Sequence, residues 1–369
     1  MIGLGIVSLL TDAASEMVFP FLPIFVMGLG GGATMLGLIE GVADAVANLL
    51  KLLAGYVTDR TGRRRPFVIC GYALSSIARP CVALATVVWH VALVRGVDRV
   101  GKGLRGAPRD ALIASAVEPA RRGEAFGFHR AMDHAGAVVG PLLALAVLQW
   151  VTEDLRVLFW WAAVPGALAV LAAFAFAREQ PTSPPAPKAA ATPASDLTRF
   201  LLPISLFNLS RASDVFLLAL ASANRGSLTE LPLLWIGLHL VRSGSATLGG
   251  RLADRRGTEL AIASGWLLHA AVFAGLAFAH DQNVIRALFL LYGLHAGLSE
   301  GAEKALIARV APSQRVGAAF GWYHFAAGGF ALVASVGFGV LWDAHGQAVA
   351  FGTSAAIAAC AAAWLLCLR

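Results

Sequence analysis

Apolar stretches of about 20 residues recur along the whole chain of 369 residues. A helix of that length crosses the ~30 Å hydrocarbon core of a bilayer and satisfies its own backbone hydrogen bonds there. Charged residues make up 14% of the chain, which is too few to cover a soluble protein of this size. The alternation of apolar and polar residues that marks a strand is absent. The sequence therefore predicts an all-α integral membrane protein.

Apolar windows between turn signals predict twelve transmembrane helices in two sets of six. Between the sets lies a segment at 178–198 that is rich in Pro, Ala, Ser and Thr, a composition that cannot bury a core. We expect an N-terminal bundle at 1–177, a cytoplasmic linker at 178–198 and a C-terminal bundle at 199–369. The expected helices lie at 2–27, 34–57, 66–88, 90–117, 123–150 and 156–177, then at 199–222, 231–252, 259–279, 284–310, 316–342 and 347–368.

The formal charge of +7 fits a membrane protein better than a nucleic-acid-binding one, because membrane proteins collect Lys and Arg in their cytoplasmic loops. With the N-terminus inside, the expected cytoplasmic segments hold 15 Lys and Arg and the external loops hold three. We expect both termini in the cytoplasm and no nucleic-acid partner. The N-terminal segment lacks a basic leader and a small-residue cleavage site, so we expect it to remain as the first span.

An internal repeat relates the two sets of helices. The pattern G-x-x-x-D-R-x-G occurs twice, 195 positions apart, and Gly123, Phe126 and Gly127 recur 194 positions later as Gly317, Phe320 and Gly321. Two matches at nearly the same offset indicate parallel repeats of six helices each. The repeated pattern is formed by Gly55, Asp59, Arg60 and Gly62, and again by Gly250, Asp254, Arg255 and Gly257.

Charged residues inside the expected helices are candidates for a polar cavity. A charge at mid-bilayer costs a few kcal/mol at least, so such residues must face protein or water. The expected helix at 90–117 carries Arg95, Asp98, Arg99, Lys102 and Arg105, and its cations share about a third of the helix surface. We expect these cations to pair with acids on other helices. The further candidates are Asp12, Glu16, Glu40, Asp44, His129, Arg130, Asp133, Arg211, Asp214, Glu300, Glu303 and His324.

Several chemistries have no support in the sequence. His129 and His134 are five residues apart and diverge on a helix, which is poor spacing for metal ligands. The phosphate-binding pattern G-x-x-x-x-G-K-[ST] is absent, and no nucleophile–base spacing stands out. We therefore expect no catalytic residue, no metal site and no cofactor, and we do not expect an enzyme.

The loop from Gly55 to Pro66 resembles the signature between helices 2 and 3 of the major facilitator superfamily. Arg95 to Gly101 resembles the superfamily's R-x-x-Q-G-x-G motif, with Asp98 and Arg99 in place of Gln and Gly. Gly136, Gly140 and Pro141 resemble the G-x-x-x-G-P core of its antiporters, although Leu143 and Ala144 replace a Gly pair there. The resemblance implies twelve helices in two pseudosymmetric halves, with Asp59 contributing to a charge relay that stabilises the outward-facing state.

Within the superfamily, the segments around Asp12 and Lys102 look like a prokaryotic subgroup without an agreed substrate. The resemblance implies a monomeric transporter in the cytoplasmic membrane of a prokaryote, which moves a small polar or amphiphilic solute by alternating access. It favours coupling to protons, with export slightly preferred over import. A receptor or assembly protein of similar architecture, which binds a ligand without moving it, remains the alternative.

Overall fold

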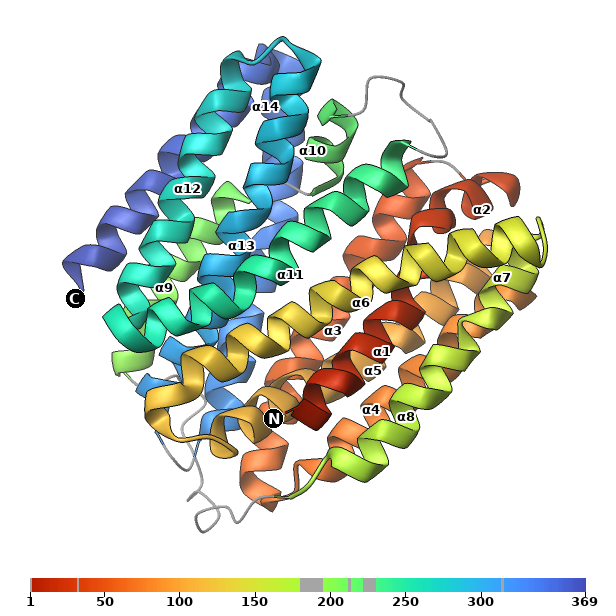
Figure 1. Cartoon of the computed structure of the whole chain (residues 1–369), viewed down its shortest axis with the longest axis horizontal. Coiled ribbons are helices and arrows are strands. Elements are labelled where there is room, and N and C mark those ends of the chain that lie inside the picture. Colours follow the sequence, from red (N-terminus) through yellow and green to blue (C-terminus); the bar gives the residue numbers. More distant parts are fainter. Residues whose placement is uncertain (1, 32, 180–194, 212–213, 222–229, 313–314) are drawn as a thin grey trace. The chain divides into compact units, whose positions relative to one another are not determined.

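The computed structural model describes residues 2–31, 33–179, 195–211, 214–221, 230–312 and 315–369. All regular structure in this part of the chain is helical (Figure 1). The central linker expected at 178–198 lies mostly outside the described residues. Contacts between Cα atoms divide the chain into two compact units. Unit 1 comprises Met1–Ala116, Met132–Ala189 and Pro312–Phe325, and unit 2 comprises Val117–Ala131, Ala190–Ala311 and Ala326–Arg369.

Each helix expected in the first half coincides with one helical element of the structure or with two or three consecutive ones. Proline and small breaks divide three of the expected helices into shorter pieces. The elements are α1 (Ile2–Glu16), η1 (Phe19–Phe21), α2 (Leu22–Gly28), α3 (Ala33–Thr61), α4 (Arg65–Ala78), η2 (Arg79–Leu84), α5 (Val88–Ser115), η3 (Pro119–Arg121), α6 (Arg122–Trp150), α7 (Leu155–Trp161) and α8 (Ala163–Phe176).

The elements of the second half also follow the order of the expected helices. The last two expected helices form one continuous element that breaks only at Gly346, where φ is 83° and ψ is 177°. Glycine adopts this left-handed conformation without the steric cost that a Cβ would bring. The elements are α9 (Ser195–Ser210), α10 (Asp214–Ala221), α11 (Glu230–Arg256), α12 (Thr258–Phe278), α13 (Gln282–Val310) and α14 (Val316–Cys367).

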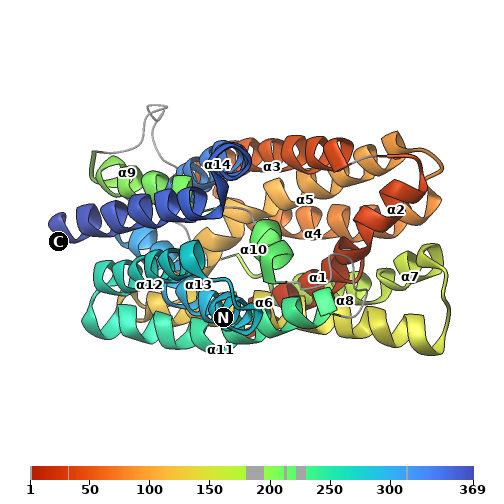
Figure 2. The same ribbon diagram turned by 90° about the horizontal axis from the view of Figure 1, so that it is seen from above.

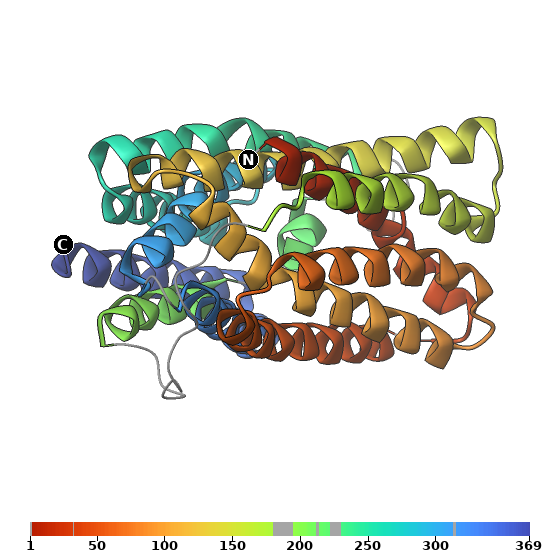
Figure 3. The same ribbon diagram turned by 90° about the horizontal axis from the view of Figure 1, so that it is seen from below.

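In unit 1, α5 packs against both α3 and α4, and α8 packs against α1 and α4 (Figures 1 and 3). An apolar core forms where η1, α2, η2 and α7 meet, around Met17, Leu22, Phe25, Val82 and Phe159. Large apolar side chains such as Trp89 and Leu93 are exposed on the outer surface of α5. This arrangement suits a helix that faces lipid on one side and protein on the other.

In unit 2, α11, α12 and α13 lie side by side (Figure 2). The core contains Phe273, Phe289, Tyr292, Phe338 and Phe351. The rings of Phe273 and Phe351 are tilted against each other, and those of Phe338 and Phe351 pack edge to face. Among the described residues, six helical segments are long and apolar enough to cross a membrane by length and composition. Buried charges of the candidate site lie on two of these segments, as Arg79 and Asp133 do, and also on α5, α11 and α13.

Candidate functional site

The first copy of the repeated loop holds the start of a helix from the other half of the sequence. Within unit 1, Asp59 in the last turn of α3 accepts hydrogen bonds from the backbone N–H groups of Gly317, at 3.0 Å, and Ala318, at 2.7 Å. The first N–H groups of a helix lack partners within the helix, and its dipole favours a negative charge there. Gly55 lies so close to Gly317 that a Cβ on Gly55 would overlap the Gly317 carbonyl.

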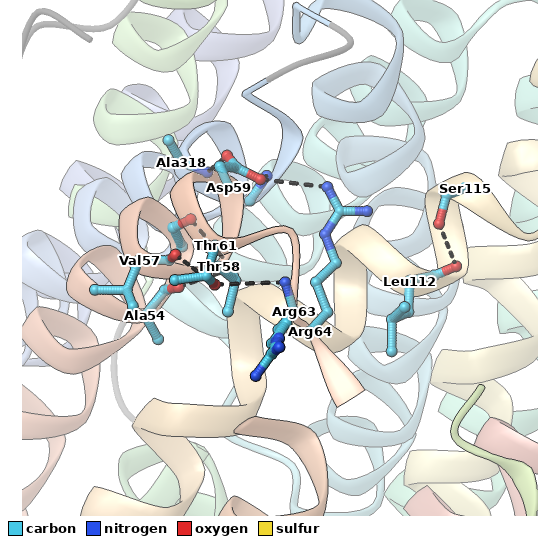
Figure 4. Close-up of polar contacts among 12 residues, drawn as sticks. Ala54, Val57, Thr58, Asp59, Thr61, Arg63, Arg64, Leu112, Ser115 and Ala318 are labelled. Carbon is cyan, nitrogen blue, oxygen red and sulfur yellow. Dashed lines mark hydrogen bonds and ion pairs between the residues drawn. The ribbon is translucent and has the colours of Figure 1, made fainter. Parts of the chain in front are cut away.

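Arg64 connects this contact to the following loop. Its Nη2 atom donates to Asp59 Oδ1 at 3.2 Å, and both side chains are buried (Figure 4). The backbone N–H groups of Arg64 and Arg65 donate to the carboxylate of Glu179, each at 2.9 Å to one of its oxygens. Gly62, with φ of 66°, ends α3 between the two contacts. Arg60 is exposed.

The second copy makes the repeat-related contact within unit 2. Asp254 in α11 accepts hydrogen bonds from the backbone N–H groups of Gly123, at 2.8 Å, and Glu124, at 2.7 Å, at the start of α6. Gly250 lies against Gly123 as Gly55 lies against Gly317. Glu124 also pairs with Arg121 at 2.9 Å and Arg251 at 3.4 Å. Asp254 and Arg255 are exposed, and Gly257 precedes α12 with φ of 99°.

Asp98 of α5 is the centre of a buried cluster of ionic side chains. It is 0% exposed, and its carboxylate lies 3.0 Å from Arg79 Nε, 3.4 Å from Arg95 Nη1 and 3.5 Å from Arg99 Nη1. Arg79 also donates to the Thr11 carbonyl of α1 at 2.7 Å. Removing one member of such a group leaves buried charges uncompensated, so the members hold α1, η2 and α5 in one arrangement.

The remaining cations of α5 have different environments. Arg105 is buried, donates to Ser75 Oγ at 2.6 Å and lies with its guanidinium carbon 4.7 Å from the Tyr72 ring centroid. Lys102 is exposed. Glu40 and Asp44 belong to α3, which packs against α5, and their side chains lie outside the described part of the structure.

Helices α1 and α6 approach each other closely at the glycines of the G-x-x-x-G-P motif. A Cβ on Gly136 would lie 2.9 Å from Asp12 Cβ, and a Cβ on Gly140 would lie 2.7 Å from Glu16 Cβ. Small residues permit such contact between transmembrane helices. Asp133, on the same helix as the glycines, accepts a hydrogen bond from Ser8. The contact therefore brings the stretch of α1 that carries Asp12 and Glu16 against α6, the helix that carries Asp133.

Pro141 follows Gly140 inside α6, which remains one helix from Arg122 to Trp150. His129 is buried in the same helix.

In unit 2, the indole N–H of Trp266 in α12 donates a hydrogen bond to Glu303 of α13 at 2.9 Å.

Two ionic groups of unit 2 involve the arginines of the second half. Glu300 of α13 pairs with Arg130 of α6, with Nε 2.6 Å from Oε2, and its other oxygen lies 3.6 Å from Arg211 Nη2. Asp214, at the start of α10, lies 2.9 Å from Arg242 Nη2 and accepts a hydrogen bond from the Tyr292 hydroxyl at 3.0 Å.

A third group lies in unit 1, at the first turns of α14. His324 Nε2 lies 2.8 Å from Asp110 Oδ2, and Arg109 Nη2 lies 3.1 Å from Asp110 Oδ1. Asp110 is fully buried. Among the described residues, His, Cys, Asp and Glu form no group of three or more that would hold a metal ion.

Sequence reasoning missed several residues of these groups. It gave no role to Arg79, Arg242, Ser8, Tyr292 or Glu179. Hydroxyl groups carry no charge to compensate, so nothing in a sequence marks them as partners of a buried carboxylate. The repeat offset could have identified Glu124 as a partner of Asp254. Glu124 lies 194 positions before Ala318, which donates to Asp59.

Comparisons with known proteins agree on one family. The Major Facilitator Superfamily model matches residues 4–301. An uncharacterized MFS-type transporter of Methanocaldococcus jannaschii is 30% identical over 350 residues, which cover 92% of this chain and 87% of the relative. The multidrug resistance protein MdtH of Photorhabdus laumondii is 32% identical over 145 residues, which cover 39% of this chain and 35% of that protein.

A solved structure supports the same fold. The human organic anion transporter MFSD10 superimposes with a TM-score of 0.87 at 16% sequence identity, and the match covers 99% of this chain and 98% of that one. The chain is thus a multi-pass membrane protein with the all-α fold of two six-helix halves, and it belongs to the Major Facilitator Superfamily of transporters.

Proposed function

We propose that this protein is a secondary active transporter that moves a small polar or amphiphilic solute by alternating access. The observation that carries the proposal is the pair of repeat-related contacts made by Asp59 and Asp254. Each carboxylate holds the first N–H groups of a helix whose sequence lies in the other repeat. The two equivalent contacts, one within each unit, link a segment of one sequence repeat to a helix start of the other.

These contacts are suited to repeated breaking and forming. A hydrogen bond to a charged group contributes about 1.5–3 kcal/mol, because water competes for both partners when the contact opens. Opening both contacts therefore costs an amount that differential binding of a solute or an ion can supply. The close glycine contacts at Gly55 and Gly250 place the carboxylates within reach of the helix starts without an intervening side chain.

The proposed driving force is the proton gradient. Asp12, Glu16 and Asp133 lie at the contact between α1 and α6, where Asp133 is buried and the cations Arg79, Lys102 and Arg105 interact electrostatically with Asp12. These two influences oppose each other, which suits a group that must bind and release protons during a cycle. Glu16 is the first candidate for the proton carrier and Asp133 is the second.

Export is the proposed direction, and two resemblances support it. The G-x-x-x-G-P motif is typical of antiporters in the family, and the partial match to the multidrug resistance protein MdtH points the same way. We place the protein in the cytoplasmic membrane of a prokaryote with both termini inside, because Lys and Arg concentrate in the loops on that side.

A thermal-shift screen of purified protein against metabolites identifies a ligand, because a ligand that binds the folded state stabilises it by mass action. The ligand is then labelled and used for counterflow in proteoliposomes. Transport predicts exchange of label across the bilayer, whereas a receptor binds the ligand without exchanging it. Glu16→Gln or Asp133→Asn should abolish gradient-driven uptake and spare exchange without a gradient. If both variants remain fully proton-driven, proton coupling lies elsewhere.

A further inference from the structure

Arg130 and His324 occupy equivalent positions in the two repeats, 194 residues apart. Each lies two turns into its helix, α6 or α14, beyond the helix start held by Asp254 or Asp59. Each also reaches a carboxylate on a helix that belongs to the other half of the sequence. Arg130 pairs with Glu300 of α13 in unit 2, and His324 pairs with Asp110 of α5 in unit 1.

The two contacts also have a similar geometry, although only their basic residues Arg130 and His324 are equivalent in the repeat. In each, one carboxylate lies between two basic side chains, which approach its two oxygens separately. Arg109 takes Oδ1 of Asp110 and leaves Oδ2 for His324. Arg211 lies nearest Oε1 of Glu300, and Arg130 takes Oε2. Each repeat thus pairs a basic residue at the equivalent position with a carboxylate from the other half of the sequence.

The chemical difference between them is the basic group at the equivalent position. An arginine guanidinium stays protonated throughout the physiological range, so the Arg130–Glu300 pair keeps its charge. A histidine imidazole gains or loses a proton within that range. When the imidazole is neutral, its contact with Asp110 is reduced to an ordinary hydrogen bond, which is weaker than one between charged groups.

We infer that His324 is a proton-binding residue of the transport cycle, and that its protonation stabilises the contact between the start of α14 and Asp110 of α5. The inference rests on the proposed alternating-access function. When α14 moves away from Asp110, the imidazolium loses its carboxylate partner, and its proton passes to water. The Arg130–Glu300 contact takes no part in this step, because its charge does not change.

The groups around His324 come from several elements. Arg109 and Asp110 of α5 face it directly, and Tyr323 precedes it on α14 with ring centroids 5.2 Å apart. From α3, Lys51 lies against Gly106 of α5, one turn before Asp110. Tyr56 of α3 also lies nearby and accepts a hydrogen bond from Trp322. Tyr72 of α4 and Asp133 of α6 both interact electrostatically with Arg109.

Hydrogen exchange of the backbone amides in residues 316–325 measures this contact without a substrate. Purified protein is compared at about pH 5 and about pH 8, with each rate corrected for the chemical exchange rate at that pH. His324→Arg should protect the segment at both pH values, and His324→Gln should leave it equally exposed at both. The wild-type protein should resemble the first variant at low pH and the second at high pH, with a difference of about ten-fold.

Two further variants control the result. His345→Gln alters an exposed histidine of the same helix and should leave the wild-type pH profile of residues 316–325 unchanged. Arg130→His places a titratable group at the equivalent contact and should make exchange at the start of α6 depend on pH.

If His324→Arg does not fold, Asp110→Asn provides the second test, because it should remove the pH dependence as His324→Gln does.

A wild-type profile identical to that of His324→Gln at both pH values would overturn the inference. The same conclusion would follow if His324→Gln kept the full wild-type pH dependence. Failure of counterflow in the wild-type protein would instead contradict the proposed transport, while the exchange profile would still report on His324. The two proposals are therefore tested by separate measurements.

Discussion

Asp59 and Ala318 are 259 positions apart in the sequence and are joined by a 2.7 Å hydrogen bond from the Ala318 backbone N–H to the Asp59 carboxylate. The bond joins the end of α3 to the start of α14, and Asp254 makes its repeat-related counterpart at the start of α6. A carboxylate stabilises the start of a helix through its negative charge and through the hydrogen bonds that its two oxygens accept. Substitutions can test each of these properties.

Asp59→Asn should abolish transport while the protein still inserts into the membrane. The amide loses the charge, and its NH2 group replaces one of the two oxygens that each accept from an N–H group of α14, so one of these N–H groups would face a donor. Counterflow measures the loss, and the membrane fraction measures insertion. Hydrogen exchange at Gly317 and Ala318 should rise in the same variant. Wild-type flux from a well-expressed variant would contradict this role.

Asp98→Asn should strongly destabilise the protein, because three arginines within 3.5 Å would lose their shared carboxylate. Removing one partner from a buried ionic group costs about 3–5 kcal/mol. Thermal unfolding in detergent provides the measurement. Arg95→Gln is the matched variant and should cost less, since Arg79 and Arg99 would still balance the carboxylate. Equal melting temperatures for Asp98→Asn and the wild type would show that the cluster contributes little to stability.

Gly140→Ala should destabilise the contact between α1 and α6. The added methyl group would lie 2.6 Å from the Ala13 carbonyl oxygen, so one helix must shift. Gly96→Ala is the control, because no atom lies within 4 Å of its Cβ position. That change should stabilise α5 by about 0.5–1 kcal/mol through helix propensity. Opposite shifts in melting temperature are expected, and a shift of the same sign in both variants would refute the packing argument.

Glu179→Gln should weaken the start of α4, because the carboxylate of Glu179 accepts from the backbone N–H groups of Arg64 and Arg65. Loss of an N-terminal cap typically costs about 0.5–2 kcal/mol. Faster hydrogen exchange at Arg64 and Arg65 would reveal the change. Glu153→Gln, an exposed glutamate in the loop before α7, serves as the control and should leave these amides unaffected.

Sequence reasoning identified the helices and the repeat because both leave a direct record in residue order. A span of about 20 apolar residues has one stable form in a bilayer, so spans such as 259–279 agree with α12 at Thr258–Phe278 within a residue. The two G-x-x-x-D-R-x-G loops at an offset of 195 predicted parallel repeats without any knowledge of contacts.

Only the tertiary structure decided which groups pair. The spacing of Arg95, Asp98 and Arg99 fixes a common face of α5, but it does not fix which helix that face meets. That choice depends on how α4 and α5 rotate and approach, and it gives Asp98 the additional partner Arg79. The partners of Asp59 are backbone N–H groups, which every residue except proline carries, so no sequence pattern identifies them. The pairing of His324 with Asp110 likewise follows from packing between segments 214 positions apart, which residue order does not record.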